Sequence, residues 1–341
     1  MSSDWSIVGN ERAARALQAA VYGGTPGHAY LFLGPEKTGR ATVARRLAQT
    51  LNCTVVNPPC GECNHCKRIE AGIHSDVVTV GVEAALDGAA RKGISVDQMR
   101  DVERMTALNP YEGSTRVVVV DPADEMSDSA QSAFLKTLEE PPPHVVFVLI
   151  AANGDRLLET IRSRCARIDF GLVAAAEIET ALLARGASAD DARLLARLSG
   201  GRPGWAIEAA RSPQVLVHRR QVLETARSLA RLPLADRMDL AEKLSDAFKR
   251  DRDATLGQLD EWAGWWRDVL LTQSGAGERV ANLDFSAELR EDAESYTRVD
   301  IAGFLQALID TRTYLCENVQ SRIALEALML AAPREAVSVQ S

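Results

Sequence analysis

The segment GPEKTGRATVA, residues 34–44, has the outline of a phosphate-binding loop that opens a helix. Such loops read G-x-x-x-x-G-K-[S/T]: backbone N–H groups bind phosphate oxygens, the lysine reaches the terminal phosphates and the hydroxyl holds Mg²⁺. Gly34 and Gly39 occupy the two glycine positions. Arg40 stands where the lysine belongs, and Ala41 where the hydroxyl belongs. The segment therefore predicts a nucleotide-type loop without its magnesium ligand.

The chemistry left to this loop is limited. Arg40 keeps a positive charge, but its planar guanidinium is a poor replacement for a compact ammonium group. Lys37 does not fit the role, because it precedes the second glycine and the helix. The glycine turn and the helix N-terminus still offer N–H groups to an anion. We expect ATP to be neither bound nor hydrolysed, with weak residual nucleotide binding as the open alternative.

A cysteine cluster follows the loop and its helix. Cys53, Cys60, Cys63 and Cys66 have the spacing C-x6-C-x2-C-x2-C. Four thiolates close a tetrahedral zinc site that keeps no open position, so its role would be structural. The alternatives are unligated thiols and an iron–sulfur cluster, whose ferredoxin-type run needs a further cysteine before a proline. We predict one structural zinc ion per chain and interpret His65 as a surplus surface residue.

Charge and composition exclude several classes of function. The chain has 341 residues and a formal net charge of −8, so it is not a strong nucleic-acid binder as a whole. It contains neither an apolar run near the ~18 residues of a membrane helix nor a signal-peptide pattern at its start. We therefore expect a soluble, cytoplasmic protein with reduced thiols, in which Cys165 and Cys316 are small buried hydrophobes.

The elements that position these residues alternate in type over residues 1–170. Short apolar runs separated by helical patterns predict a parallel sheet, and continuous apolar strands predict a sheet covered on both faces. Expected strands are residues 29–33, 76–80, 116–121, 144–151 and 166–170, and expected helices are 10–21, 40–53, 94–108 and 126–140. Ser95 with Gln98 predicts a capping box, and Ser127 predicts a helix N-cap.

Beyond residue 170 the pattern is helical, with charged outer faces and Leu/Ala inner faces. Trp262, Trp265 and Trp266 share one helical face, which we interpret as core. Residues 315–330 are expected to form one amphipathic helix, with Arg322 and Asn318 on its polar face as capping or ion-pairing residues.

Together these motifs resemble those of the delta-prime subunits of bacterial DNA polymerase III clamp loaders, a family of AAA+ proteins. The resemblance covers nearly the whole chain and rests on HAYLFLGP, the cysteine module, CKRIEAGIHSDV, ISVDQMR, NPYEG, SAFLKTLEEPP and TIRSRC. It implies an α/β AAA+ core with a parallel sheet and zinc module, a small helical lid and an all-α collar. The implied bounds are 1–170 for the core, 171–205 for the lid, 206–335 for the collar and 336–341 for a tail.

The resemblance also bears on the nucleotide site. Active members of the family end the third strand with Asp-Glu, whereas here Asp121 is followed by Pro122. Gly204 aligns with the family's sensing arginine, and Arg202 stands two places too early for that role. The vestigial site would thus consist of Gly34, Gly39, Arg40 and Asp121. A weakened ATPase is the main alternative; an iron–sulfur electron carrier and a repair or recombination motor are further ones.

The motif TIRSRC implies a role for the chain other than ATP hydrolysis. In this family the arginine of the S-R-C motif reaches the γ-phosphate of ATP on the neighbouring motor subunit, which assigns a catalytic arginine finger in trans to Arg164. Arg162 is the rival, and a surface ion pair is the plain alternative.

The implied role is a rigid, non-catalytic subunit of the DNA polymerase III holoenzyme. Its implied partners are the motor (gamma/tau) and delta subunits, the sliding clamp and primed DNA within a hetero-oligomeric ring, with no membrane. For direct DNA contact the segment offers Arg91, Lys92 and Arg100, which a solvated charged face also explains.

Overall fold

The computed structural model describes residues 5–82, 93–317 and 319–333. The chain divides into two compact units, one of residues Met1–Ala181 and Gly201–Trp205, the other of Leu182–Gly200 and Ala206–Ser341. The expected division into core, lid and collar remains a prediction. Arg91, Lys92 and the expected tail 336–341 lie outside the described residues.

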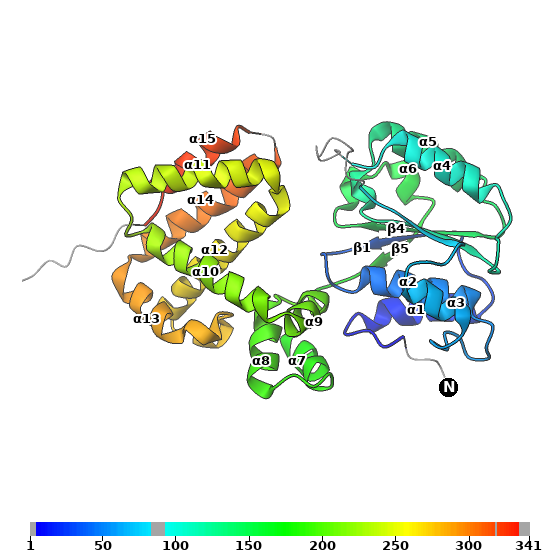
Figure 1. Cartoon of the computed structure of the whole chain (residues 1–341), viewed down its shortest axis with the longest axis horizontal. Coiled ribbons are helices and arrows are strands. Elements are labelled where there is room, and N and C mark those ends of the chain that lie inside the picture. Colours follow the sequence, from blue (N-terminus) through cyan, green and yellow to red (C-terminus); the bar gives the residue numbers. More distant parts are fainter. Residues whose placement is uncertain (1–4, 83–92, 318, 334–341) are drawn as a thin grey trace, which may run out of the picture. The chain divides into compact units, whose positions relative to one another are not determined.

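The first unit is built on a five-stranded parallel sheet (Figure 1). The strands run in the order β2 (Val77–Val80), β3 (Arg116–Val120), β4 (Val145–Ala151), β1 (Ala29–Leu33) and β5 (Ala166–Asp169). β1 lies between β4 and β5, with Leu31 in register with Leu149 on one side and Arg167 on the other. All carboxyl ends of the strands therefore meet at one edge, and the expected strands are confirmed to within one residue.

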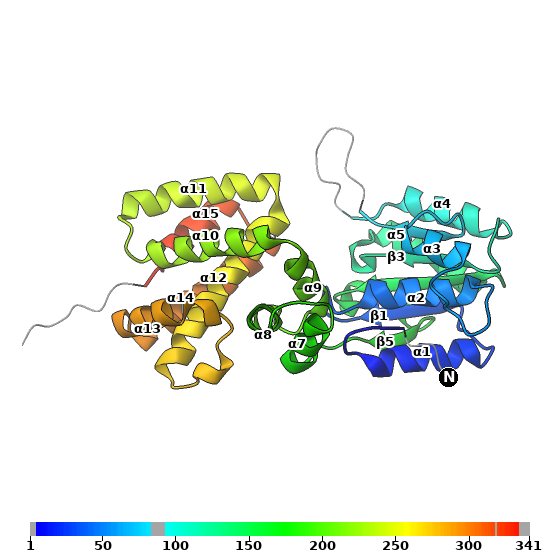
Figure 2. The same ribbon diagram turned by 60° about the horizontal axis from the view of Figure 1, so that its bottom comes forward.

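Helices cover both faces of this sheet (Figures 1 and 2). One face carries α1 (Glu11–Tyr22), α2 (Arg40–Asn52) and α3 (Asn64–Glu70), and the other carries α4 (Val96–Thr106), α5 (Asp128–Glu139) and α6 (Glu159–Arg162). Along β1, Leu31 packs with the α4–α6 side, whereas Tyr30 and Phe32 pack with the α1–α3 side. The expectation of a sheet buried on both faces is confirmed.

Local signals in the sequence account for several helix ends. Ser95 and Gln98 form the expected capping box of α4, and the Ser127 hydroxyl accepts the Ala130 N–H at the start of α5. Helix α3 was not expected, because its seven residues lie inside the cysteine module, where turns dominate the pattern.

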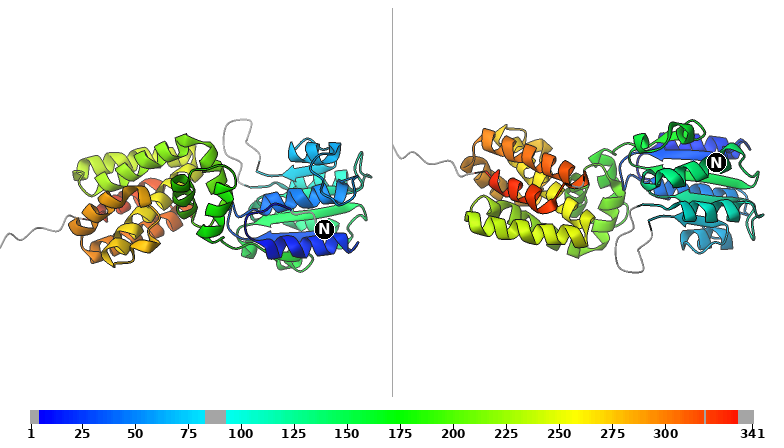
Figure 3. Two further views of the ribbon diagram at one scale, coloured as in Figure 1. Left: turned by 90° about the horizontal axis from the view of Figure 1, so that it is seen from below. Right: turned by 90° about the horizontal axis from the view of Figure 1, so that it is seen from above.

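The second unit is an α-helical bundle (Figure 3). Its helices are α8 (Ala189–Leu198), α10 (Pro213–Leu229), α11 (Leu234–Arg250), α12 (Arg252–Gln273), α13 (Ser286–Ser295), α14 (Arg298–Cys316) and α15 (Ser321–Leu330), whereas α7 (Ala175–Leu183) and α9 (Pro203–Arg211) each have residues in both units. α12 packs against α10, α11, α13 and α14, which makes it the central helix of the bundle. None of the described helices is long and apolar enough to cross a membrane.

The three tryptophans of α12 form the centre of this bundle. Trp262, Trp265 and Trp266 are fully buried, as expected of core residues. The Trp265 ring meets Phe285 edge-on, and the Trp266 ring meets Phe304 in the same way. Because T-shaped pairs add to the stabilisation that comes from burial of their area, these contacts strengthen the packing of α12 against its neighbours.

One expectation in this unit is wrong. Residues 315–330 do not form a single helix: α14 ends at Cys316 and α15 begins at Ser321. The apolar spacing continues across the break, which is why periodicity missed it. Arg322 forms the expected ion pairs, with Glu326 at 2.8 Å and Glu242 at 3.2 Å, while Asn318 lies outside the described residues.

A buried ion pair fastens β2 to β3 at the end opposite the nucleotide-type loop. The Asp76 carboxylate lies 2.9 Å from Arg116 Nη2 and accepts the backbone N–H groups of Tyr111, Glu112 and Gly113. Burial alone would raise the pKa of Asp76, but these hydrogen bonds and Arg116 hold that pKa well below its usual range.

We predict that Asp76→Asn lowers the free energy of unfolding by about 3–5 kcal/mol at pH 7, because it leaves the Arg116 charge buried and uncompensated. Since the pKa of Asp76 is depressed in the folded state, the loss should shrink as the pH falls below about 4, where the unfolded carboxyl takes up its proton. Urea unfolding across pH measures this. Asp97→Asn at the exposed start of α4 is the control, and equal stabilities of the two variants would contradict the prediction.

Candidate functional site

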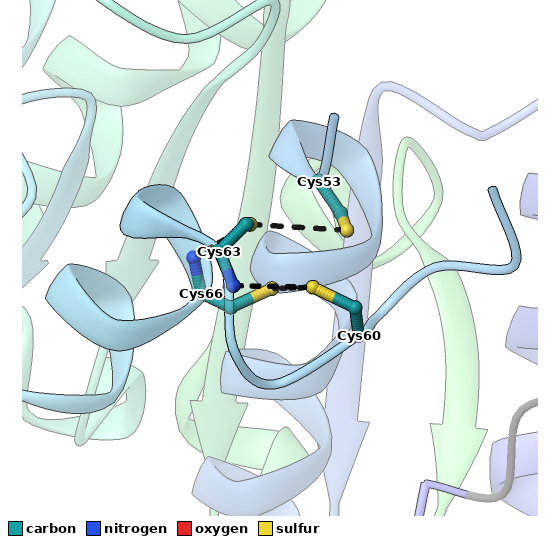
Figure 4. A group of neighbouring side chains, drawn as sticks. All are labelled: Cys53, Cys60, Cys63 and Cys66. Carbon is teal, nitrogen blue, oxygen red and sulfur yellow. Dashed lines mark hydrogen bonds between the residues drawn. The ribbon is translucent and has the colours of Figure 1, made fainter. Parts of the chain in front are cut away.

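The cysteine module is a compact turn between α2 and α3 (Figure 4). Cys53 follows the last residue of α2, Cys63 is the N-cap of α3, and Cys66 lies in its first turn. The Sγ atoms of Cys60 and Cys66 are 4.0 Å apart, as are those of Cys53 and Cys63. All four Sγ atoms lie within 4.8 Å of one another.

This geometry fits zinc. A tetrahedral Zn–S distance of 2.3 Å requires sulfur–sulfur distances of about 3.8 Å. Backbone N–H groups also point at the sulfurs, Cys63 N at Cys60 Sγ (3.2 Å) and Cys66 N at Cys63 Sγ (3.5 Å). Such donors stabilise thiolates; although burial opposes it, they and the neighbouring sulfurs lower the pKa of the Cys63 thiol to about 6. The four cysteines could therefore hold one structural zinc ion.

His65 is not the surface residue that we expected. It is half-buried, and its Nδ1 lies 2.9 Å from Nε2 of the buried His74. The Asp76 N–H donates to His74 Nδ1, so the proton of His74 sits on Nε2 and is donated to His65. The pair thus links the cysteine module to the Asp76–Arg116 network. No local sequence signal indicates it, because His65 lies in the first turn of α3 and His74 lies four residues after that helix ends.

The nucleotide-type loop joins β1 to α2. Gly34 has φ 147° and lies so close to β5 that a Cβ atom there would come within 2.1 Å of the Phe170 carbonyl oxygen. Gly39, with φ 101°, is the N-cap of α2 and provides no side-chain cap. Gly34 is therefore required both by its close approach to Phe170 and by its positive φ. Gly39 is required by its positive φ alone.

The loop carbonyls are already bound within the protein. The Asn10 amide donates to the Thr38 carbonyl at 3.2 Å and also bridges to the backbone of Gly171. The Gly204 N–H donates to the Lys37 carbonyl at 2.8 Å, and a Cβ atom at position 204 would lie 2.9 Å from that oxygen. The place of an aligned sensing arginine thus has no room for a side chain unless the backbone shifts. Sequence reasoning missed Asn10, since an asparagine before a helix is common.

Arg40 turns inward from the loop toward carboxylates. Its side chain is almost fully buried, and its Nη1 has no hydrogen-bond partner among the described residues. Burial lowers the pKa of Arg40, and the nearby charges of Asp121, Glu36 and Asp124 oppose this effect. Burial likewise raises the pKa of Asp121, and Arg40 opposes that rise. The arginine therefore provides positive charge beside Asp121.

Acidic residues follow the end of β3, before and within a short turn. Pro122 follows Asp121, and Asp124 lies in the single 3₁₀ turn η1 (Ala123–Glu125). Asp124 Oδ2 accepts the Asn153 N–H at 2.9 Å, so this carboxylate joins the ends of β3 and β4. Asn153 itself was not singled out from the sequence, because a polar residue after a strand carries no specific signal.

Arg162 and Arg164 lie in and just after the short helix α6. Arg164 Nη2 lies 2.7 Å from Glu139 Oε1, and Nη1 lies 2.9 Å from the Thr160 carbonyl oxygen. Arg162 makes a longer contact of 3.3 Å with Asp155 and lines a cleft of about 640 Å³ that also reaches Gly34. The two arginines are thus held separately. On α4, Arg100 forms an exposed pair with Asp97.

Comparison with known proteins gives a consistent picture. A family model described as "DNA polymerase III, delta subunit" matches residues 9–173. The delta-prime subunit of DNA polymerase III from Bacillus subtilis (strain 168) is 29% identical over 304 residues, or 89% of this chain and 90% of that protein. The tau subunit from the same strain is 38% identical over 166 residues. The tau subunit from Escherichia coli (strain K12) is 28% identical over 347 residues.

The shares of each relative that are covered differ. The match with the Bacillus tau subunit covers 48% of this chain and 28% of that protein, and the match with the Escherichia tau subunit covers 96% and 53%. The chain thus spans well under two thirds of either tau subunit, and nearly all of the delta-prime relative.

We predict about one zinc per purified chain by metal analysis, and its loss in Cys66→Ser together with a lower melting temperature of the first unit. Cys66 is the buried ligand, so its removal also disrupts the packing of α3. Cys316→Ser, in the helical bundle, is the control and should keep the metal. A brown protein that contains iron would contradict the zinc assignment.

We predict that Arg40→Met lowers the free energy of unfolding by about 3 kcal/mol, because it leaves carboxylates facing one another without a cation. Adding Asp121→Asn should recover part of that loss, since the two residues interact. Loss of Arg40 should raise the pKa of Asp121 further, so the destabilisation should decrease as the pH falls. Denaturant unfolding at several pH values measures this. The control is Arg45→Met, which breaks only an exposed pair with Glu70; purely additive changes would contradict the prediction.

Proposed function

We propose that this chain belongs to the family of bacterial DNA polymerase III delta-prime subunits and that it acts in the replicative clamp loader as a non-catalytic subunit. In this role it helps to load the sliding clamp onto primed DNA and completes the ATP site of a neighbouring motor subunit. Its partners are the gamma/tau and delta subunits, and it works in the cytoplasm. Delta-prime, tau and gamma subunits are among the relatives found.

The observation that carries the proposal is the state of the loop at the end of β1. Phosphoryl transfer needs a compact cation on the terminal phosphates, a hydroxyl ligand for Mg²⁺ and a group that positions water. Here the cation position is a buried guanidinium among the chain's own carboxylates, the hydroxyl position is Ala41, and Pro122 follows Asp121. We infer that the chain does not hydrolyse ATP.

Arg164 is the residue that we assign to the neighbour's ATP. Its side chain is about one third exposed. An arginine supplied in trans stabilises the charge that develops on the transferred phosphoryl group, a contribution on the order of 10³–10⁵ in rate. Arg162, which lines a cleft of its own chain, is the weaker candidate.

The rest of the chain has supporting roles in this proposal. The zinc module stiffens the core through α3 and the His65–His74 pair. Residues 171–205 act as the lid, which binds the loop through the Gly204 N–H, and residues 206–335 form the collar that holds the subunit in the ring.

A weakened ATPase is the second candidate. The N-terminus of α2 has no side-chain cap and lies directly after the glycine turn, so its N–H groups remain suited to an anion. Under this alternative the chain would bind nucleotide and turn it over slowly by itself.

We predict that the isolated chain releases no phosphate from ATP. In a ring reconstituted with the motor and delta subunits of the same organism, Arg164→Ala should lower clamp-dependent ATP turnover more than tenfold at the site that it completes. Arg162→Ala is the matched control, since it neutralises an arginine two residues away. Steady turnover by the isolated chain that Asp121→Asn abolishes would instead favour the weakened ATPase.

A further inference from the structure

We propose that Glu139, the last residue of α5, is a positioning residue that holds the Arg164 guanidinium in the orientation in which it meets a neighbour's triphosphate. The inference rests on the proposed function of Arg164. Glu139 would not touch the nucleotide; it would act through the arginine alone.

The contacts leave the arginine both fixed and available. A guanidinium has five N–H donors. One donates to Glu139 Oε1 at 2.7 Å and one to the Thr160 carbonyl at 2.9 Å, so two acceptors define the plane of the group. Three donors remain for a phosphate, and the side chain is 35% exposed. Pre-orientation of this kind removes part of the ordering cost that a mobile arginine would pay in the transition state.

The acceptors belong to a rigid part of the first unit. α5 is anchored by Phe134, whose ring meets Phe147 of β4 edge-on, and by the buried Leu138 next to Glu139. The segment that carries Arg164 is anchored by Ile161, which is fully buried, and by Cys165.

A buried glutamine joins these two parts. Gln131 of α5 donates its amide to the Arg156 carbonyl at 3.1 Å and accepts the Leu158 N–H at 2.8 Å. α5 therefore holds the α6 segment at both ends, through Gln131 before the helix and through Glu139 after it.

Helix stability does not explain a glutamate at this position. The C-terminal end of a helix carries partial negative charge, which disfavours acidic residues there. α5 nevertheless ends with Glu139 and is followed by Glu140 as its C-cap. The ion pair with Arg164 offsets this unfavourable interaction and accounts for a glutamate at position 139. Arg162, by comparison, has only its 3.3 Å contact to the highly exposed Asp155, and its Nε has no partner among the described residues.

The test uses the reconstituted ring. Glu139→Ala should lower the ATP turnover number about three- to tenfold and leave the KM for ATP within about twofold, because orientation matters in the transition state. Glu139→Gln should retain turnover within about twofold, because its amide oxygen still accepts the Arg164 hydrogen bond. Glu140→Ala, at the adjacent exposed residue, is the control and should change nothing.

A second measurement on the isolated chain separates positioning from folding. NMR of the arginine side chains should show restricted rotation of the Arg164 guanidinium in the wild type and faster rotation in Glu139→Ala. The melting temperature should stay within about 2 °C, since exposed pairs contribute little to stability.

The outcomes distinguish the two proposals. If Arg164→Ala impairs the ring and Glu139→Ala does not, the positioning role is refuted and the proposed function stands. If Glu139→Ala or Glu139→Gln raises turnover, Glu139 restrains the arginine rather than orienting it, and the inference is again refuted. If Arg164→Ala has no effect on the ring, both proposals fall.

Discussion

The burial of β1 between β4 and β5 is the constraint on which the rest of the first unit depends. Its side chains are buried on both faces, so a shift in register would disrupt the packing on both. The loop that follows must therefore start at a fixed point against the Phe170 carbonyl, where only glycine fits. Because the sheet is parallel, the same edge receives Asp121 from β3 and Asn153 from β4. The positions of the nucleotide-type loop, Asp121 and Asn153 therefore follow from the way the strands end at this edge of the sheet.

At that edge, the charges around the nucleotide-type loop determine how the loop is stabilised. In a working nucleotide site, Mg²⁺ and a lysine provide the positive charge that acidic residues and phosphates require. Here the buried Arg40 lies among Asp121, Asp124 and Glu36, so the protein supplies a cation from its own chain. Lys37, Thr38 and Gly204 are joined by backbone and amide hydrogen bonds, which stabilise the loop without a ligand. The loop is therefore held in place by groups of the chain itself.

The cysteine module and the segment that carries Arg164 are also held by contacts with other elements of the first unit. The cysteine module contacts the core through the His65–His74 pair, and that pair leads to the buried Asp76–Arg116 ion pair at the start of β2 and β3. On the opposite face, α5 fastens the segment that carries Arg164. One face of the sheet thus carries the cysteine module and the other carries the Arg164 segment, and both are joined by hydrogen bonds to elements that pack on the sheet.

The sequence by itself determined the strands, most helices of the first unit and the cysteine cluster, because these depend on periodicity and on spacing over a few residues. It also identified Arg40 and Ala41 as departures from a loop pattern, since that pattern is local. It did not reveal the break before α15, where apolar spacing continues through non-helical residues, nor the short helix α3. Only the tertiary structure decided where Arg40 turns, that Glu139 meets Arg164, and that His65 pairs with His74. The physical reason is that these contacts join residues from different elements, and their partners are chosen by how the elements pack rather than by any signal in the neighbouring sequence.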